Sequence, residues 1–200
     1  MISRSERYED IQRRRINPHR TMLESLFLEL IQSERSAEIL PRREASRLED
    51  SAPARALRSV SQHALSVRDE LHEIACSRGI RIAAGRKVGE LFSLARAWFA
   101  DAMMEEERAY RATLLGMRHG LDLVKLLRAT AESSDDDILA GWCTEWLGVR
   151  EPLVEEVCNQ LAWFGWHPET AIQHRGGPRL ALSRFMLSMR NESTEEVFGV

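Results

Sequence analysis

The residues best suited to chemistry in this chain are glutamates and histidines that fall within helical stretches of sequence. Four of them are candidate metal ligands: Glu34, His63, His119 and Glu156. Carboxylate and imidazole groups from facing helices are the usual ligands of a dinuclear centre in a helical bundle. Glu34 is the most informative, because at about 100° per residue it lies on the same helical face as the apolar residues before it. Burying a lone carboxylate there costs several kcal/mol, so Glu34 needs a partner on another helix.

The same four residues have a second interpretation, in which buried polar groups satisfy one another between helices without a metal ion. For His119 the functional interpretation is supported by Asp122, which lies about one turn later and could orient the imidazole as a metal ligand or general base. A histidine on a packed helix face is more often a hydrogen-bonded core residue than a ligand. We therefore favour the interpretation without metal for all four residues.

Four amphipathic segments are expected to position these side chains. Their apolar periods predict helices over 18–38, 54–78, 105–131 and 135–165. The first is expected to end before Pro41, so that 41–54 forms a connection. Gly79 is expected to adopt the left-handed conformation after the second helix, and Ser134 or Asp135 to cap the fourth. Pro152 is expected to kink the fourth helix.

A further helical segment at 87–103 lies between the second and third helices, where two parallel helices need a long crossover. The strings LIQSERSAEIL, EERAYRATLLGMRHGLDLV and LVEEVCNQL also resemble stretches of the ferritin-like four-helix-bundle superfamily. The resemblance covers most of residues 18–165. It implies an all-α fold, an antiparallel four-helix bundle with a helical crossover and a short C-terminal helix.

The resemblance also implies a dinuclear site with two Glu-x-x-His pairs, and this chain departs from that pattern. Val60 stands three residues before His63, and Glu156 is followed by Asn159 where the family has histidine. We therefore expect no bound iron, manganese or zinc. The favoured function is a non-catalytic binding, structural or stress-associated bundle.

Two other functions remain open from the sequence. The first is a metal-binding ferritin-like protein that uses iron or manganese at an irregular site for oxidation or storage. The second is a haem-type sensor that uses His119 and an aromatic-rich region, although such residues are more often core. That region comprises Trp142, Trp146, Trp163 and Phe164, with Trp98 and Phe99 opposite.

The chain divides into a polar basic arm (1–17), a helical bundle domain (18–166) and a final segment (167–200). The final segment contains a loop, a short amphipathic helix and a tail. A short amphipathic helix must bury its apolar side, so it is expected to fold back or to pair two chains. We expect a homodimer that associates through helical surfaces and this C-terminal segment.

Composition narrows the partners and the compartment. A net charge of −3 gives no reason to expect nucleic acid, and no apolar run approaches the 18 residues or so of a membrane span. The three cysteines, Cys76, Cys143 and Cys158, have neither metal-site spacing nor the pattern of a disulfide framework. With no apolar leader at the N-terminus, we expect a cytoplasmic protein.

Overall fold

A computed structural model of the protein describes residues 18–80 and 105–173, and these residues are entirely helical or connecting. The helices are α2 (Pro18–Arg47), α3 (Ala52–Ser77), α5 (Glu106–Glu132), α6 (Asp137–Asn159), α7 (Leu161–Trp166) and α8 (Pro168–Ala171). The predicted all-helical class is confirmed for this part of the chain. The predictions for the arm at 1–17, the crossover at 87–103 and residues 174–200 lie outside the described residues.

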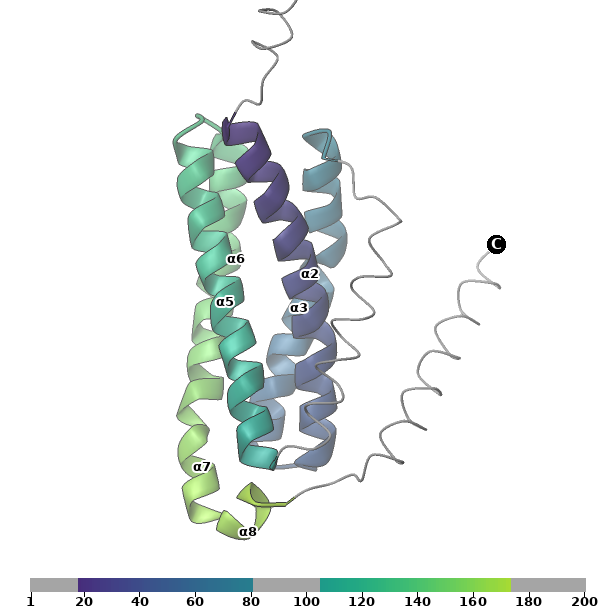
Figure 1. Ribbon diagram of the computed structural model, residues 1–200, viewed down its shortest axis with the longest axis vertical. Coiled ribbons are helices and arrows are strands. Elements are labelled where there is room, and N and C mark those ends of the chain that lie inside the picture. The colour runs from purple at the N-terminus through teal and green to yellow at the C-terminus, as the bar shows by residue number, and fades with distance from the viewer. Residues whose placement is uncertain (1–17, 81–104, 174–200) are drawn as a thin grey trace, which may run out of the picture.

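The four long helices lie side by side (Figure 1). In this view α2 runs from top to bottom, α3 returns upward, α5 also runs upward and α6 runs down. Contacts join α2 to α3, α3 to α6, α6 to α5 and α5 to α2. Each long helix therefore turns one face toward a common centre, and α7 and α8 lie at the lower end.

The first helix is longer than its sequence predicts. We expected it to end before Pro41, but α2 continues through Pro41 to Arg47. Proline removes the hydrogen bond that its nitrogen would donate to the Ala37 carbonyl. Pro41 is nonetheless buried, and the buried period continues through Ala45. Packing of this last stretch therefore outweighs the lost bond, and only residues 48–51 connect α2 to α3.

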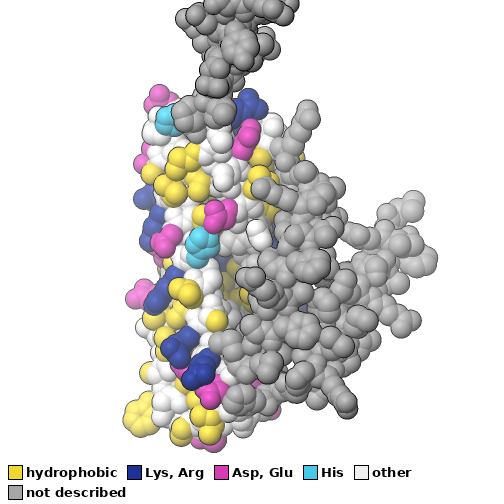
Figure 2. Space-filling view, in the orientation of Figure 1, with side chains coloured by type: hydrophobic (Ala, Val, Ile, Leu, Met, Phe, Trp, Pro, Cys, Tyr) yellow, Lys and Arg dark blue, Asp and Glu magenta, His cyan; other side chains and the backbone are white. Residues whose placement is uncertain are grey.

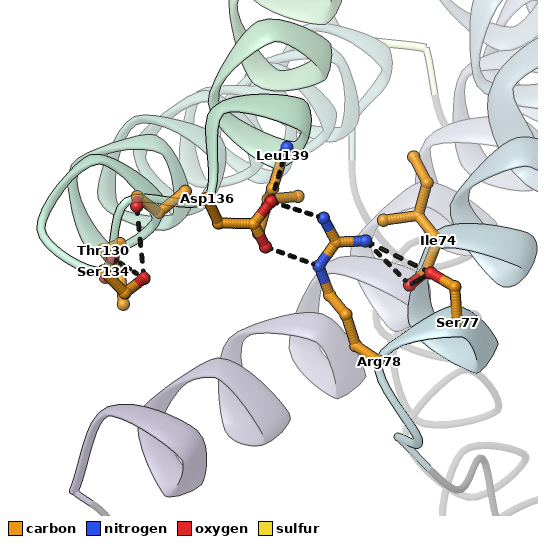
Figure 3. A network of polar contacts seen from close by, with 8 residues as sticks. Ile74, Ser77, Arg78, Thr130, Ser134, Asp136 and Leu139 are labelled. Carbon is orange, nitrogen blue, oxygen red and sulfur yellow. Dashed lines mark hydrogen bonds and ion pairs between the residues drawn. The ribbon is translucent and has the colours of Figure 1, made fainter.

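The upper end of the molecule is held by an ion pair between α3 and α6. Asp136, rather than the expected Ser134 or Asp135, caps α6 by accepting a hydrogen bond from the Leu139 N–H at 3.0 Å. Arg78, just after α3, donates to both carboxylate oxygens of Asp136, at 2.8 and 2.7 Å (Figure 3). Gly79 follows with a φ of +68°, as expected of a left-handed residue after a helix.

The fourth predicted helix is interrupted near its end. It divides at Gln160 into α6 and the short α7, whereas we expected one helix to residue 165. The Tyr110 hydroxyl donates a hydrogen bond to the Val157 carbonyl at 2.8 Å. In a continuous helix the Leu161 N–H would donate to this same carbonyl. The segment after Trp166, expected as a loop, contains the single turn of α8.

The core consists of two apolar clusters stacked along the bundle. One gathers Phe27, Leu71, Leu127 and Trp142, and the other gathers Leu57, Tyr110, Val154 and Phe164. Three polar residues fall in sequence between members of the two clusters: Glu34 on α2, His63 on α3 and Arg150 on α6. These three polar residues therefore mark the boundary between the two apolar clusters.

Candidate functional site

The centre of the bundle contains a buried arginine that links two of the predicted metal ligands. The Arg150 Nη2 donates to Glu34 Oε2 at 2.6 Å, and its Nε donates to His63 Nδ1 at 2.9 Å. Arg150 is 1% exposed and Glu34 is 2% exposed. The structure thus brings Glu34 and His63 to one place, with a guanidinium as their common partner.

Burial sets the protonation behaviour of this cluster. Desolvation raises the pKa of Glu34 and lowers the pKa of Arg150, and the attraction between the two groups opposes both shifts. Desolvation, with the Arg150 charge second, lowers the pKa of His63 to about 4. His63 is therefore neutral near pH 7, and its Nδ1 lone pair receives the Arg150 N–H.

Trp146 completes the cluster from the same helix as Arg150. The Arg150 Cζ atom lies 4.7 Å from the centre of the Trp146 ring, within cation–π range. The His63 ring lies 6.0 Å from the same ring. The Trp146 indole N–H also acts on the buried Glu34 carboxyl, whose pKa it helps to lower against the larger effect of burial.

The aromatic-rich region expected from the sequence is divided between the two apolar clusters. Trp142 and Trp146 belong to the upper cluster, whereas Phe164 belongs to the lower one with Trp163 packed against it. The expected core role is confirmed for the buried Trp142, Trp146 and Phe164. Trp98 and Phe99 lie outside the described residues.

The other two predicted ligands lie on the surface. His119 is on the outside of α5, where its Nε2 lies 3.1 Å from Glu29 Oε1, and its side chain is 56% exposed. The expectation of a core position for His119 is therefore wrong, because its row on α5 faces outward. Glu156 is exposed on α6 and accepts a hydrogen bond from Gln160 at 2.6 Å. Neither residue joins Glu34 and His63.

Sequence reasoning missed the residue that organises the centre. Arg150 continues the apolar stripe of α6 between Leu147 and Val154, three residues after one and four before the other. An arginine on such a stripe signals a buried acid opposite, just as Glu34 signals a buried base. The two residues were therefore identifiable as a pair from their positions.

Two further buried glutamates, Glu44 and Glu106, also escaped prediction. Arg47 donates to Glu44 Oε2 at 3.0 Å. Glu44 lies beyond Pro41, in the stretch that the sequence assigned to a connection, so its helical face was not considered. Both glutamates lie in the lower half of the molecule, where α2 ends and α5 begins.

A groove runs between α2 and α5 on the outside of the bundle. It has a volume of about 320 Å³, at the small end of the range for ligand pockets. Small and hydroxyl-bearing residues line it, with the Glu29–His119 pair at one end; among them are Ser33, Ser36, Ala37, Ala112, Thr113 and Gly116. Figure 2, in the same orientation as Figure 1, shows hydrophobic and charged side chains interspersed over the visible part of this face.

The lowered pKa of His63 predicts a pH-dependent loss of stability. Between pH 6.5 and about 4 the unfolded chain binds a proton at His63 that the folded chain does not. This contribution to stability is therefore complete above pH 6.5 and is lost as the pH falls toward 4. Allowing for solvent screening of a partly exposed ring, we expect a loss of about 1–2 kcal/mol.

The control for this prediction is His63→Asn, whose Oδ1 replaces the Nδ1 acceptor but does not titrate. Glu34 and Arg150 remain in both proteins, so their own titrations largely cancel in the difference. Urea unfolding at several pH values should show the wild type losing stability relative to His63→Asn only below pH 6.5. A constant difference from pH 8 to pH 4 contradicts the assignment.

The hydrogen bonds of Arg150 join three of the long helices, α2, α3 and α6, at one level of the bundle. Within residues 18–80 and 105–173, no three His, Cys, Asp or Glu side chains come together as a group able to hold a metal ion. None of the helices in these ranges is long and apolar enough to cross a membrane. Comparison with protein-family models, curated proteins and solved structures finds no match to this chain.

Proposed function

We propose that the protein is a non-catalytic helical bundle of the ferritin-like type, acting as a binding or structural protein in the cytoplasm. The observation that carries the proposal is the bridge from Glu34 through Arg150 to His63 at the bundle centre. In a dinuclear bundle protein, inward carboxylates and imidazoles meet around metal ions. Here the corresponding groups meet around a guanidinium.

A guanidinium is a poor substitute for a metal ion in catalysis. It is permanently charged, donates hydrogen bonds and has no acceptor site or open coordination position. It also takes up the His63 Nδ1 lone pair and one Glu34 oxygen, which a metal ion would need. Arg150 therefore supplies charge balance and helix registration where a metal would supply reactivity.

The order of the helices supports the ferritin-like part of the proposal. α3 and α5 both run upward in Figure 1, so these two long helices are parallel although one follows the other among the described elements. A parallel pair of this kind belongs to the one-crossover ferritin-like topology, whereas successive helices of a simple up-and-down bundle are antiparallel. The free thiols of Cys76, Cys143 and Cys158 suit a reducing cytoplasm.

Because side chains fill the centre of the bundle, we expect a partner to bind on the outer surface. The groove between α2 and α5 is lined on both sides by small residues, which allow another surface to approach closely. We therefore propose that the protein works by association, in the first place with itself as a homodimer.

Metal uptake tests the proposal. Purified protein, dialysed without oxygen against Fe²⁺ and in parallel against Mn²⁺ or Zn²⁺, should retain far less than one ion per chain by elemental analysis. One or two ions per chain, released by Glu34→Ala, would establish the metal-binding alternative. An equal number retained by wild type and Glu34→Ala would place metal at some other site, and the bundle would no longer be the metal-free protein proposed here.

A further inference from the structure

The outer face of the α2–α5 pair carries two rows of residues spaced seven apart. One row is Met22, Glu29 and Ser36 on α2, and the other is Leu126, His119 and Ala112 on α5. Seven residues are almost two full helical turns, so each row stays on one side of its helix. This spacing is the one by which helices pack along a seam.

The two rows are in register with each other. The 3.1 Å contact between Glu29 and His119 fixes their common level. Because α2 and α5 run in opposite directions (Figure 1), Met22 comes level with Leu126, and Ser36 comes level with Ala112. The face therefore has an apolar level, a polar level and a level of small residues beside the groove.

The apolar level is unusually exposed for large side chains. Met22 is 39% exposed and Leu126 is 44% exposed. Leu115, which is 69% exposed, lies between Ala112 and His119 in sequence, three residues after one and four before the other, and so on the same outer side of α5. This face therefore exposes large apolar side chains that a second surface could cover.

We infer that a second copy of the chain packs on this face, around a twofold axis parallel to the helices. This rotation places α2 of one protomer against α5 of its partner, so the two rows exchange and meet in register. Met22 then faces Leu126, Glu29 faces His119, and Ser36 faces Ala112 across the interface, each twice. The inference rests on the self-association in the proposed function and names its surface.

Charge favours the twofold axis parallel to the helices over a twofold axis that lies in the plane of the interface but is perpendicular to the helices. An axis perpendicular to the helices at the level of Glu29 places α2 against α2, and hence Glu29 against Glu29. Like charges in a desolvated contact disfavour that arrangement, whereas an acid facing an imidazole is complementary. The polar level therefore fixes which helices meet, as a polar residue does within a seam.

Light scattering on the full-length protein tests the surface. The wild type should have twice the chain mass of 22.9 kDa, and Leu126→Glu should reduce it to 22.9 kDa at the same concentration. The matched control is Val149→Glu on α6, since Val149 is 49% exposed and lies outside the two rows. This control should remain dimeric, and circular dichroism should show both variants folded.

Each contrary result has a distinct meaning. A wild type of 22.9 kDa overturns the self-association and this surface together. A dimer that persists in Leu126→Glu, or one that Val149→Glu dissociates equally, overturns the surface alone. Neither result bears on the metal-free centre, which the uptake experiment tests separately.

Disulfide trapping tests the axis. In a Cys76→Ser background, which removes the exposed thiol, Met22→Cys and Leu126→Cys chains are made separately, then mixed and oxidised. The inferred axis predicts cross-links that join one chain of each kind, in excess of those formed by either chain alone. The perpendicular axis instead brings Met22 level with Ser36 of the partner, because it reverses the helix direction about Glu29. Cross-links between Met22→Cys and Ser36→Cys chains, with none between Met22→Cys and Leu126→Cys chains, would therefore contradict the inference.

Discussion

Replacing Arg150 with methionine is expected to lower the free energy of unfolding by about 3–5 kcal/mol, because it leaves a buried carboxylate without its cation. Glu34 is 2% exposed, and Arg150 is the cation that donates a hydrogen bond to it. The same substitution removes the cation from the Trp146 ring and the donor from His63. Urea unfolding at pH 7, with the slope checked for two-state behaviour, measures the loss.

The second half of the experiment pairs Arg150→Met with Glu34→Leu. A buried ion pair gains little over well-packed apolar residues, so the double variant should recover most of the loss and lie within about 2 kcal/mol of wild type. Single variants that each cost less than about 1 kcal/mol, the range of surface ion pairs, would show that the bridge is not formed in the buried centre. Additive losses would show that the two residues do not interact.

Substituting leucine for Gly120 is expected to cost about 2–3 kcal/mol by forcing α2 away from α5. A Cβ atom at Gly120 lies only 3.0 Å from Ser33 Oγ, and a leucine side chain extends well beyond that point. Ser33 directly precedes Glu34 on α2, so the displacement also strains the ion pair. Thermal and urea unfolding both report this effect.

The matched control is Gly148→Leu on α6, where a Cβ atom meets nothing within 4 Å. Both substitutions gain helix propensity, worth about 1 kcal/mol, and only one meets a neighbouring helix. Gly148→Leu should therefore be neutral or slightly stabilising. Equal effects of the two variants would contradict the close approach of α2 and α5 at Gly120.

The interiors of the helices were predictable from the sequence, because they depend on a local apolar period. Their ends were less so. Pro41 was expected to end α2, but its ring is buried and the packing of the following turn maintains the helix. The break at Gln160 follows the hydrogen bond from Tyr110 to Val157, two residues that are 47 apart in sequence, and no local pattern contains such a contact.

In the candidate site, the burial of Glu34 was predicted from the sequence, whereas the identity of its partner was not. Glu34 was correctly expected to be buried with a partner, since its position on the apolar face is a local property. Its partner, Arg150, is set by packing between α2 and α6, which a pattern within one helix does not contain. His119 was misplaced because the apolar residues around it, including Leu115 and Leu126, prove to be exposed.

The claim that Arg150 replaces a metal ion at the bundle centre is tested most directly by metal content. Protein purified without chelator and dialysed against Fe²⁺ or Mn²⁺ without oxygen should contain far less than one ion per chain, and Glu34→Ala should not change that value. One or two ions per chain in the wild type, lost in Glu34→Ala, would contradict the account.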